Sequence, residues 1–107
     1  MHPQEIPQGI DLIYRFDPQG RFTYVNEKAR ALFDMDIEAI LGQPYYSFVR
    51  EDFQEKVAAF YALQIEKRQA SSYFEFPFIA DGKEIWIGQT IELLCENNKV
   101  IELLGVA

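Results

Sequence analysis

The stretch from Tyr14 to Phe33 constrains the fold of this chain more than any other part of it. Two runs that alternate apolar and polar side chains flank the tetrapeptide DPQG at positions 17–20. Proline suits the second position of a tight turn, and glycine adopts the positive φ that many turns need. Asn26 can accept a hydrogen bond from a free N–H in the first turn of a helix. The stretch therefore predicts two strands and a capped helix, over residues 11–16, 21–25 and 27–33.

The second of these strands has a side-chain pattern that assigns its two faces. Successive side chains of a regular strand point to opposite sides. We therefore expect Phe22 and Tyr24 to share one face, and Arg21, Thr23 and Val25 to share the other.

The rest of the chain continues with helices and then with strands. A short helix over about 36–41 should end at Gly42, and residues 44–49 form a compact aromatic turn. A long helix over 52–67 follows from one apolar stripe. Three strands, over 71–79, 83–95 and 99–106, are joined by Asp-Gly and Asn-Asn turns. The stripe of the long helix consists of Phe53, Val57, Phe60, Tyr61 and Ile65.

This order of elements, β-β-α-α-α-β-β-β, predicts an α+β domain with helices on one side of a single antiparallel sheet. The 107 residues suffice for one domain. We expect an irregular N-terminal lead-in over 1–9 and a single domain over 10–107. With 15% aromatic residues, the chain can build a core without disulfides or metal.

Composition excludes several classes of function. The net charge of −7 and the dispersed basic residues argue against a nucleic-acid surface. One cysteine permits no intrachain disulfide, which fits a reducing cytoplasm. No apolar run approaches the roughly 20 residues that span a bilayer, and the N-terminus lacks a signal-peptide pattern. We expect a cytoplasmic segment without membrane contact, although its parent protein could be membrane-anchored.

Five sequence pieces follow one another along about residues 10–107: FDPQGRFTYVN, Leu41-Gly42, SFVREDF, FEFPFIADGKEIWIGQ and the terminal LLGVA. Taken in this order, they resemble a Per-Arnt-Sim (PAS) sensor domain. The resemblance implies a PAS-like fold, with a five-stranded antiparallel sheet and helices packed on one face. It also implies a sensory module of a sensor histidine kinase or diguanylate cyclase type, whose effector domain lies in the same full-length chain.

The sequence lacks the residues that bind the cofactors of two known PAS subgroups. The light-oxygen-voltage type needs a reactive cysteine in an NCRFLQ motif, which is absent; Cys95 lies near a strand end. The haem-binding type usually takes a His on the long helix as axial ligand, but the only histidine is His2. We therefore expect neither haem nor a covalent flavin adduct, and no metal. An unidentified small organic ligand stays open.

A ligand pocket is suggested by the strand over 83–95. Gln89 interrupts an otherwise aliphatic row that, by the resemblance, faces a cavity between sheet and helices. An unpaired buried amide costs roughly 1–3 kcal/mol, so its partner would be a ligand, a water or Glu75, unless it is simply a satisfied core amide. Apolar residues would shape the pocket, and Glu75 and Gln89 would orient the ligand. The candidate ligand-binding residues are Tyr46, Phe48, Phe53, Phe60, Glu75, Ile87, Gln89 and Ile91.

The strand over 71–79 permits two registers. Either Phe74, Phe76 and Phe78 face the core, or Tyr73, Glu75 and Pro77 do. Alignment with PAS relatives favours the second register, which would place the three phenylalanines outside with Trp86 and Leu94. A patch that large should be covered. We therefore expect a homodimer through the sheet face or the N-terminal segment.

Three functions remain. The first is a sensor module that binds a small ligand, dimerises or does both, and has no catalytic residues. The second is a dimerisation scaffold with a filled core and no ligand, which a very small cavity would favour. The third is a small α+β enzyme, for which Glu75 is the only suitable buried acid.

Overall fold

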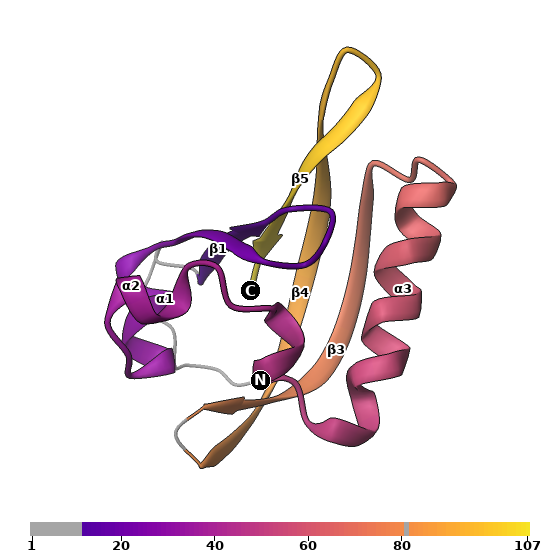
Figure 1. The fold of residues 1–107 in the computed structure, drawn as a ribbon. Helices are drawn as coiled ribbons and strands as arrows, with labels where there is room; N and C mark the ends of the chain where they lie inside the picture. Colours follow the sequence, from indigo (N-terminus) through magenta and orange to yellow (C-terminus); the bar gives the residue numbers. More distant parts are fainter. Residues whose placement is uncertain (1–11, 81) are drawn as a thin grey trace.

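The computed structural model describes residues 12–80 and 82–107 and shows a single five-stranded sheet (Figure 1). Its strand order is β2-β1-β5-β4-β3, and neighbouring strands pair antiparallel. The predicted lead-in, and the first residue of the first predicted strand, lie outside the described residues. The strands are β1 (Ile13–Phe16), β2 (Phe22–Val25), β3 (Ser71–Ala80), β4 (Lys83–Glu96) and β5 (Lys99–Val106).

The helices connect β2 to β3 and cover one face of the sheet. Figure 1 shows the long helix α3 running alongside β3, with α1 and α2 at the side of β1. The predicted α+β fold is therefore confirmed. The long helix begins two residues later than predicted, because residues 51–53 form a separate 3-10 turn. The bounds are α1 (Glu27–Phe33), α2 (Ile37–Ile40), η1 (Tyr45–Phe48), η2 (Glu51–Phe53) and α3 (Gln54–Glu66).

Local side chains produce the opening hairpin and its helix as the sequence predicts. The Asp17 Oδ1 accepts hydrogen bonds from the N–H groups of Gln19 at 3.0 Å and Arg21 at 2.9 Å. Gly20 has a φ of +91°, which a residue with a Cβ rarely adopts. At the helix start, the Asn26 Oδ1 accepts a hydrogen bond from the Ala29 N–H at 2.9 Å.

The predicted alternation in β2 is wrong because the hairpin contains a bulge. Arg15 pairs with Tyr24, but the next residue, Phe16, pairs with Phe22, so Thr23 is an extra residue on β2. The bulge turns both ends of the strand inward: Phe22 and Val25 are buried, whereas Thr23 and Tyr24 are exposed.

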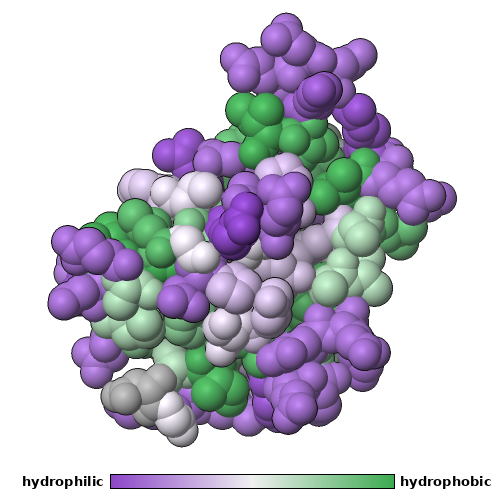
Figure 2. All heavy atoms as spheres, viewed as in Figure 1, coloured by the Kyte–Doolittle hydropathy of each residue, from purple (hydrophilic) through white to green (hydrophobic). Residues whose placement is uncertain are grey.

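The β4–β5 hairpin projects beyond the body of the domain (Figure 1). Its turn residues, Asn97 and Asn98, have φ values of +53° and +69°, as a tight two-residue hairpin turn requires. Figure 2 shows hydrophilic residues covering this tip. The projecting end is therefore solvated, and the buried residues of β4, which are Ile87, Gln89 and Ile91, lie in the middle of that strand.

The register expected for β3 is wrong, and the other register holds. Phe76 and Phe78 are 3% and 4% exposed, whereas Tyr73 is 58% exposed. The phenylalanine row lies opposite the aliphatic row of β4, with Phe76 beside Ile87 and Phe78 beside Ile85. Turning this row inward shields its large phenylalanine rings from water, whereas Tyr73 and Glu75 of the other row stay exposed. Pro77 belongs to the other row but is fully buried as well.

The core is largely aromatic and lies between the inner sheet face and the helices. Phe33 stacks on Phe48 with ring centroids 4.8 Å apart, and on Phe78 at 5.0 Å. Farther along β3, Phe74 stacks on Phe60 of α3 at 4.5 Å. Such contacts tie α1, η1 and α3 to β3 through rings that also bury large apolar areas.

Candidate binding cavity

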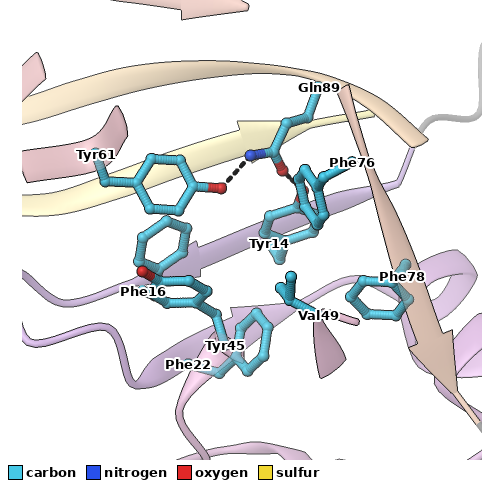
Figure 3. Close-up of a pocket in the computed structure, with 9 residues that line it drawn as sticks. All are labelled: Tyr14, Phe16, Phe22, Tyr45, Val49, Tyr61, Phe76, Phe78 and Gln89. Atoms are coloured by element: carbon cyan, nitrogen blue, oxygen red, sulfur yellow. Dashed lines mark hydrogen bonds between the residues drawn. The ribbon is translucent and has the colours of Figure 1, made fainter. Parts of the chain in front are cut away.

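A small cavity lies inside the domain, between the inner face of the sheet and the helical side (Figure 3). Its volume is about 10 Å³, which is close to the space that one water molecule needs. Aromatic rings form most of its wall, and Gln89 is the one amide among the lining residues that the structure describes. The lining residues are Tyr14, Phe16, Phe22, Tyr45, Val49, Tyr61, Phe76, Phe78 and Gln89.

Gln89 is the centre of a buried chain of hydrogen bonds (Figure 3). The Tyr14 hydroxyl donates to the Gln89 Oε1, and the Gln89 Nε2 donates to the Tyr61 hydroxyl oxygen. Gln89 is completely buried, and the two tyrosines are 6% and 5% exposed. The chain joins three elements, β1, β4 and α3, and it satisfies the amide that interrupts the aliphatic row. We call it the Tyr14–Gln89–Tyr61 chain.

Burial keeps the phenols of this cavity protonated. It raises the pKa of Tyr14 and of Tyr61 well above the ordinary value for tyrosine, and it raises the pKa of Tyr45 to about 12. Among the described residues, those that line the cavity include no side chain that is charged at neutral pH. The site can therefore hold a neutral group by hydrogen bonding, but it has no ionised base or acid to offer.

Of the predicted site residues, Gln89 lines the cavity and Glu75 points away from it. The orientation expected for Glu75 is wrong: its carboxylate is exposed on the outer face and accepts a hydrogen bond from the Tyr73 hydroxyl at 2.8 Å. Glu75 points outward because the phenylalanine row of β3, and not the row that contains Glu75, faces the core. Ile87 and Ile91 are buried in the same inward row of β4 as Gln89.

The four predicted aromatic residues lie outside the cavity wall as the structure has it. Phe48 belongs to the aromatic stack of the core, and Phe60 packs on Phe74. Phe53 contacts Trp86 edge-on at 5.4 Å, and Tyr46 is 47% exposed. A role for these residues in ligand binding stays a prediction.

Sequence reasoning missed the two tyrosines that bond Gln89. Tyr61 lies in the apolar stripe of the long helix, and Tyr14 lies in the first strand. The sequence pattern indicates only a core position for the one and a strand position for the other. A signal was present, because a tyrosine at an apolar position needs a buried partner for its hydroxyl.

A second buried amide, Gln64, is structural. Its Nε2 donates to the backbone carbonyls of Ile91 and Gln69, each at 3.0 Å, and its Oε1 accepts from the Ser72 hydroxyl at 2.6 Å. These bonds fix the C-terminal half of α3 to β4 and to the start of β3. They satisfy the amide with protein groups alone and lie away from the cavity.

The described residues contain no cluster of His, Cys, Asp and Glu side chains that could hold a metal ion. Within the same residues, no helix combines the length and apolar character needed to cross a bilayer.

Known proteins share this fold. The model of the PAS fold family matches residues 10–107. A PAS domain of a protein from Colwellia psychrerythraea superimposes with a TM-score of 0.81 at 22% identity, over 90% of this chain and 82% of that one. The N-terminal domain of a diguanylate cyclase with PAS/PAC sensor from Marinobacter aquaeolei superimposes with a TM-score of 0.75 at 18% identity, over 91% of this chain and 92% of that one. A domain of a sensory box sensor histidine kinase/response regulator from Geobacter sulfurreducens superimposes with a TM-score of 0.76 at 20% identity, over 94% of this chain and 83% of that one.

The comparison with curated protein sequences gave no match. The structural similarities, at these low identities, establish the fold, and the family match extends over nearly the whole chain. PAS domains are typically non-catalytic sensor modules. The chain belongs to the PAS family of sensory domains found in signalling proteins.

Proposed function

We propose that this PAS domain is the sensory module of a signal-transduction protein of the sensor histidine kinase or diguanylate cyclase type. The effector domain would lie in the same full-length chain. The observation that carries the proposal is the buried Tyr14–Gln89–Tyr61 chain beside the cavity. A molecule that took the place of one tyrosine hydroxyl on Gln89 would break this chain. Displacing Tyr61 would shift α3 against the sheet, and that shift would be the signal.

The cavity chemistry favours a small neutral ligand with a hydrogen-bonding group and an apolar body. A charged ligand would lose its hydration without gaining a counter-ion, because the described lining residues carry no charge. Gln89 would orient the polar group, and the surrounding rings would provide shape. The buried neighbours Ile87 and Ile91 would border the site once it expanded.

The small cavity volume specifically favours a second candidate function. A cavity of about 10 Å³ does not accommodate an organic molecule unless side chains move. The second candidate is a ligand-free dimerisation scaffold, in which the Tyr14–Gln89–Tyr61 chain only fixes the core. It differs from the first candidate in requiring no ligand at all.

Both candidates include a homodimer formed through the outer face of the sheet. Trp86 and Tyr73 on this face are 54% and 58% exposed, and half-exposed aromatic side chains are common at the centres of interfaces. Trp86→Glu should abolish a dimer measured by sedimentation equilibrium. Tyr46→Glu is the control, because Tyr46 is similarly exposed but belongs to η1 rather than to the sheet.

A cytoplasmic location completes the proposal. Its support is the single cysteine of the chain, Cys95, which is free and exposed. A reducing compartment keeps such a thiol from forming a disulfide with another molecule. Alkylation of Cys95 in intact cells by a membrane-permeant reagent, but not by an impermeant one, would support this location.

Native mass spectrometry of the freshly purified domain tests the choice between sensor and scaffold. A sensor should carry a bound small molecule, or should gain mass with members of a metabolite library. Gln89→Leu should lose that mass, whereas the exposed-site control Tyr24→Phe, at a residue outside the cavity lining, should keep it. A bare chain that no library member binds or thermally stabilises would reject the ligand-binding function and leave the scaffold.

A further inference from the structure

Residues 42–53, which we call the strap, connect the two edge strands of the sheet across its inner face. At one end, the Gly42 N–H donates to the Phe22 carbonyl of β2 at 2.9 Å, and the Tyr45 N–H donates to the Gly20 carbonyl at 2.8 Å. At the other end, the Arg50 N–H donates to the Pro77 carbonyl of β3 at 3.1 Å. Since β2 and β3 are the two edges of the sheet, the strap is bonded to both.

Two side chains of the strap form part of the cavity wall. Figure 3 shows Tyr45 and Val49 at the side of the cavity opposite Gln89. The Tyr45 ring lies against Gly20, where a Cβ atom would come within 2.8 Å of it, and its centroid is 5.1 Å from that of Tyr61. Tyr45 is only half-buried, so this residue of the strap both lines the cavity and reaches solvent.

The β3 end of the strap is held from outside by Arg50. Its guanidinium donates to both oxygens of Asp52, at 2.7 and 3.1 Å, and to Glu84 of β4 at 3.0 Å. It also lies over the rings of Phe53 and Trp86, at 5.3 and 5.8 Å from their centroids. Arg50 therefore reaches around the edge strand β3 and binds residues on the outer face.

The outer contacts of Arg50 are of a kind that can open without unfolding the domain, because the opening moves residues 49–53 while the Phe48 ring stays stacked on Phe33 and Phe78. The strap consists of two short 3-10 turns, and the Arg50 side chain is 35% exposed. Segments with few regular backbone bonds and with exposed ion pairs open locally at lower free energy than central strands do. The central strands β4 and β5, by contrast, pair along most of their length.

We propose that the strap is the gate of the cavity and that Arg50 holds the gate closed. Releasing Arg50 from Glu84 and Trp86 of β4 lets the β3 end of the strap move away from the sheet, which removes Val49 from the cavity wall and exposes Trp86 further. Asp52 belongs to the strap itself and orients the Arg50 guanidinium. One side chain thereby couples access to the cavity with the outer face of the sheet. The chemical nature of the ligand that enters the cavity rests on the proposed function, whereas the local opening of the strap does not.

Native-state hydrogen exchange of the whole domain tests this gate without any ligand. In the wild type, the amides of Val49 and Arg50, at the β3 end of the strap, should exchange through a local opening, faster than the slowest amides of β4 and β5. Arg50→Ala should accelerate the strap amides about tenfold relative to those slow amides. Arg30→Ala is the matched control, because Arg30 forms an exposed ion pair with Glu27 at 2.8 Å on α1, away from the strap.

Trp86 provides a second measurement, since it is the only tryptophan of the chain. Glu84→Gln and Arg50→Lys should each increase quenching of its fluorescence by acrylamide, and both should preserve the fold. Lysine retains the charge but loses the planar guanidinium that bonds Glu84 while Asp52 orients it. The same increase should follow in wild-type protein at 1 M salt, where the screening length falls to about 3 Å.

The gate is overturned if the strap amides of the wild type exchange only with those of the central strands. It is also overturned if Arg50→Ala and Arg30→Ala change the strap amides equally. These results are separate from the mass-spectrometry result: an opening strap with no bound molecule would reject the ligand and keep the gate. A bound molecule together with a strap that never opens locally would support ligand binding and reject the gate.

Discussion

The ring of Tyr14 lies across Gly105, so that the hydroxyl of a β1 residue reaches Gln89 on β4 over the intervening strand β5. Tyr14 pairs directly with Gly105 in the β1–β5 ladder, and Gly105 pairs with Ile91 of β4 on its other side. A Cβ atom on Gly105 would lie 2.2 Å from the Cε1 of Tyr14. The glycine is therefore required for the Tyr14–Gln89–Tyr61 chain to form.

Gly105→Ala should destabilise the domain by about 1–3 kcal/mol, because the new methyl group displaces a fully enclosed ring. Urea denaturation followed by circular dichroism measures this change. Gly88→Ala is the matched control: its Cβ would also meet a tyrosine, at 2.0 Å from the Tyr73 hydroxyl, but that side chain is exposed and free to rotate. Equal losses in the two variants would contradict the role given to Gly105.

Gln89→Leu should cost about 1–3 kcal/mol, because the hydroxyls of Tyr14 and Tyr61 lose their buried partner. Adding Tyr14→Phe and Tyr61→Phe to this variant should recover part of the loss, since the unpaired hydroxyls are then removed as well. Unfolding free energies from urea titrations provide both values. If the triple variant is less stable than Gln89→Leu alone, the hydroxyls have other partners.

Stability should fall at alkaline pH because burial raises the pKa of Tyr14 and Tyr61. A group whose pKa is higher in the folded state stabilises the fold fully below its unfolded pKa, here about 10. That contribution is lost as the pH rises from there towards the folded value. The melting temperature of the wild type should therefore decline above pH 10, and that of the double variant Tyr14→Phe with Tyr61→Phe should decline less. If the melting temperatures of the wild type and the double variant decline equally, other titrating groups cause the loss of stability.

Phe78→Ala should cost about 3–5 kcal/mol, because a large buried ring is removed from the core stack. Tyr73→Ala, five residues earlier on the opposite face of β3, should change stability by less than about 1 kcal/mol. Thermal melts of the two variants measure the difference. The reverse ranking would support the register in which Tyr73, Glu75 and Pro77 face the core.

Much of the fold could be predicted because its signals are local. The Asp17 turn, the Asn26 cap, the apolar stripe of α3 and the Asn97-Asn98 turn each depend on residues close together in the sequence. Such signals determine where an element begins and ends, and the order of elements indicated the PAS fold. The inward row of β4 was predicted as well, because its alternation is regular.

The candidate site could be predicted only in part. Gln89 was found because it interrupts an apolar row, but its partners lie 75 and 28 residues away in the chain. The position of Gly105 beneath Tyr14 likewise depends on the pairing of β1 with β5. No local pattern specifies which distant hydroxyl meets a given amide.

The sequence by itself determined the elements, their order and the family, since propensities, caps and turns act over a few residues. Only the tertiary structure decided which face of β3 is buried, because both of its faces carry large apolar side chains. It also decided the β2 bulge that turns Val25 inward, and the partners of Gln89. These outcomes depend on how segments far apart in the chain fill a shared volume, which is a property of the packed domain rather than of any one segment.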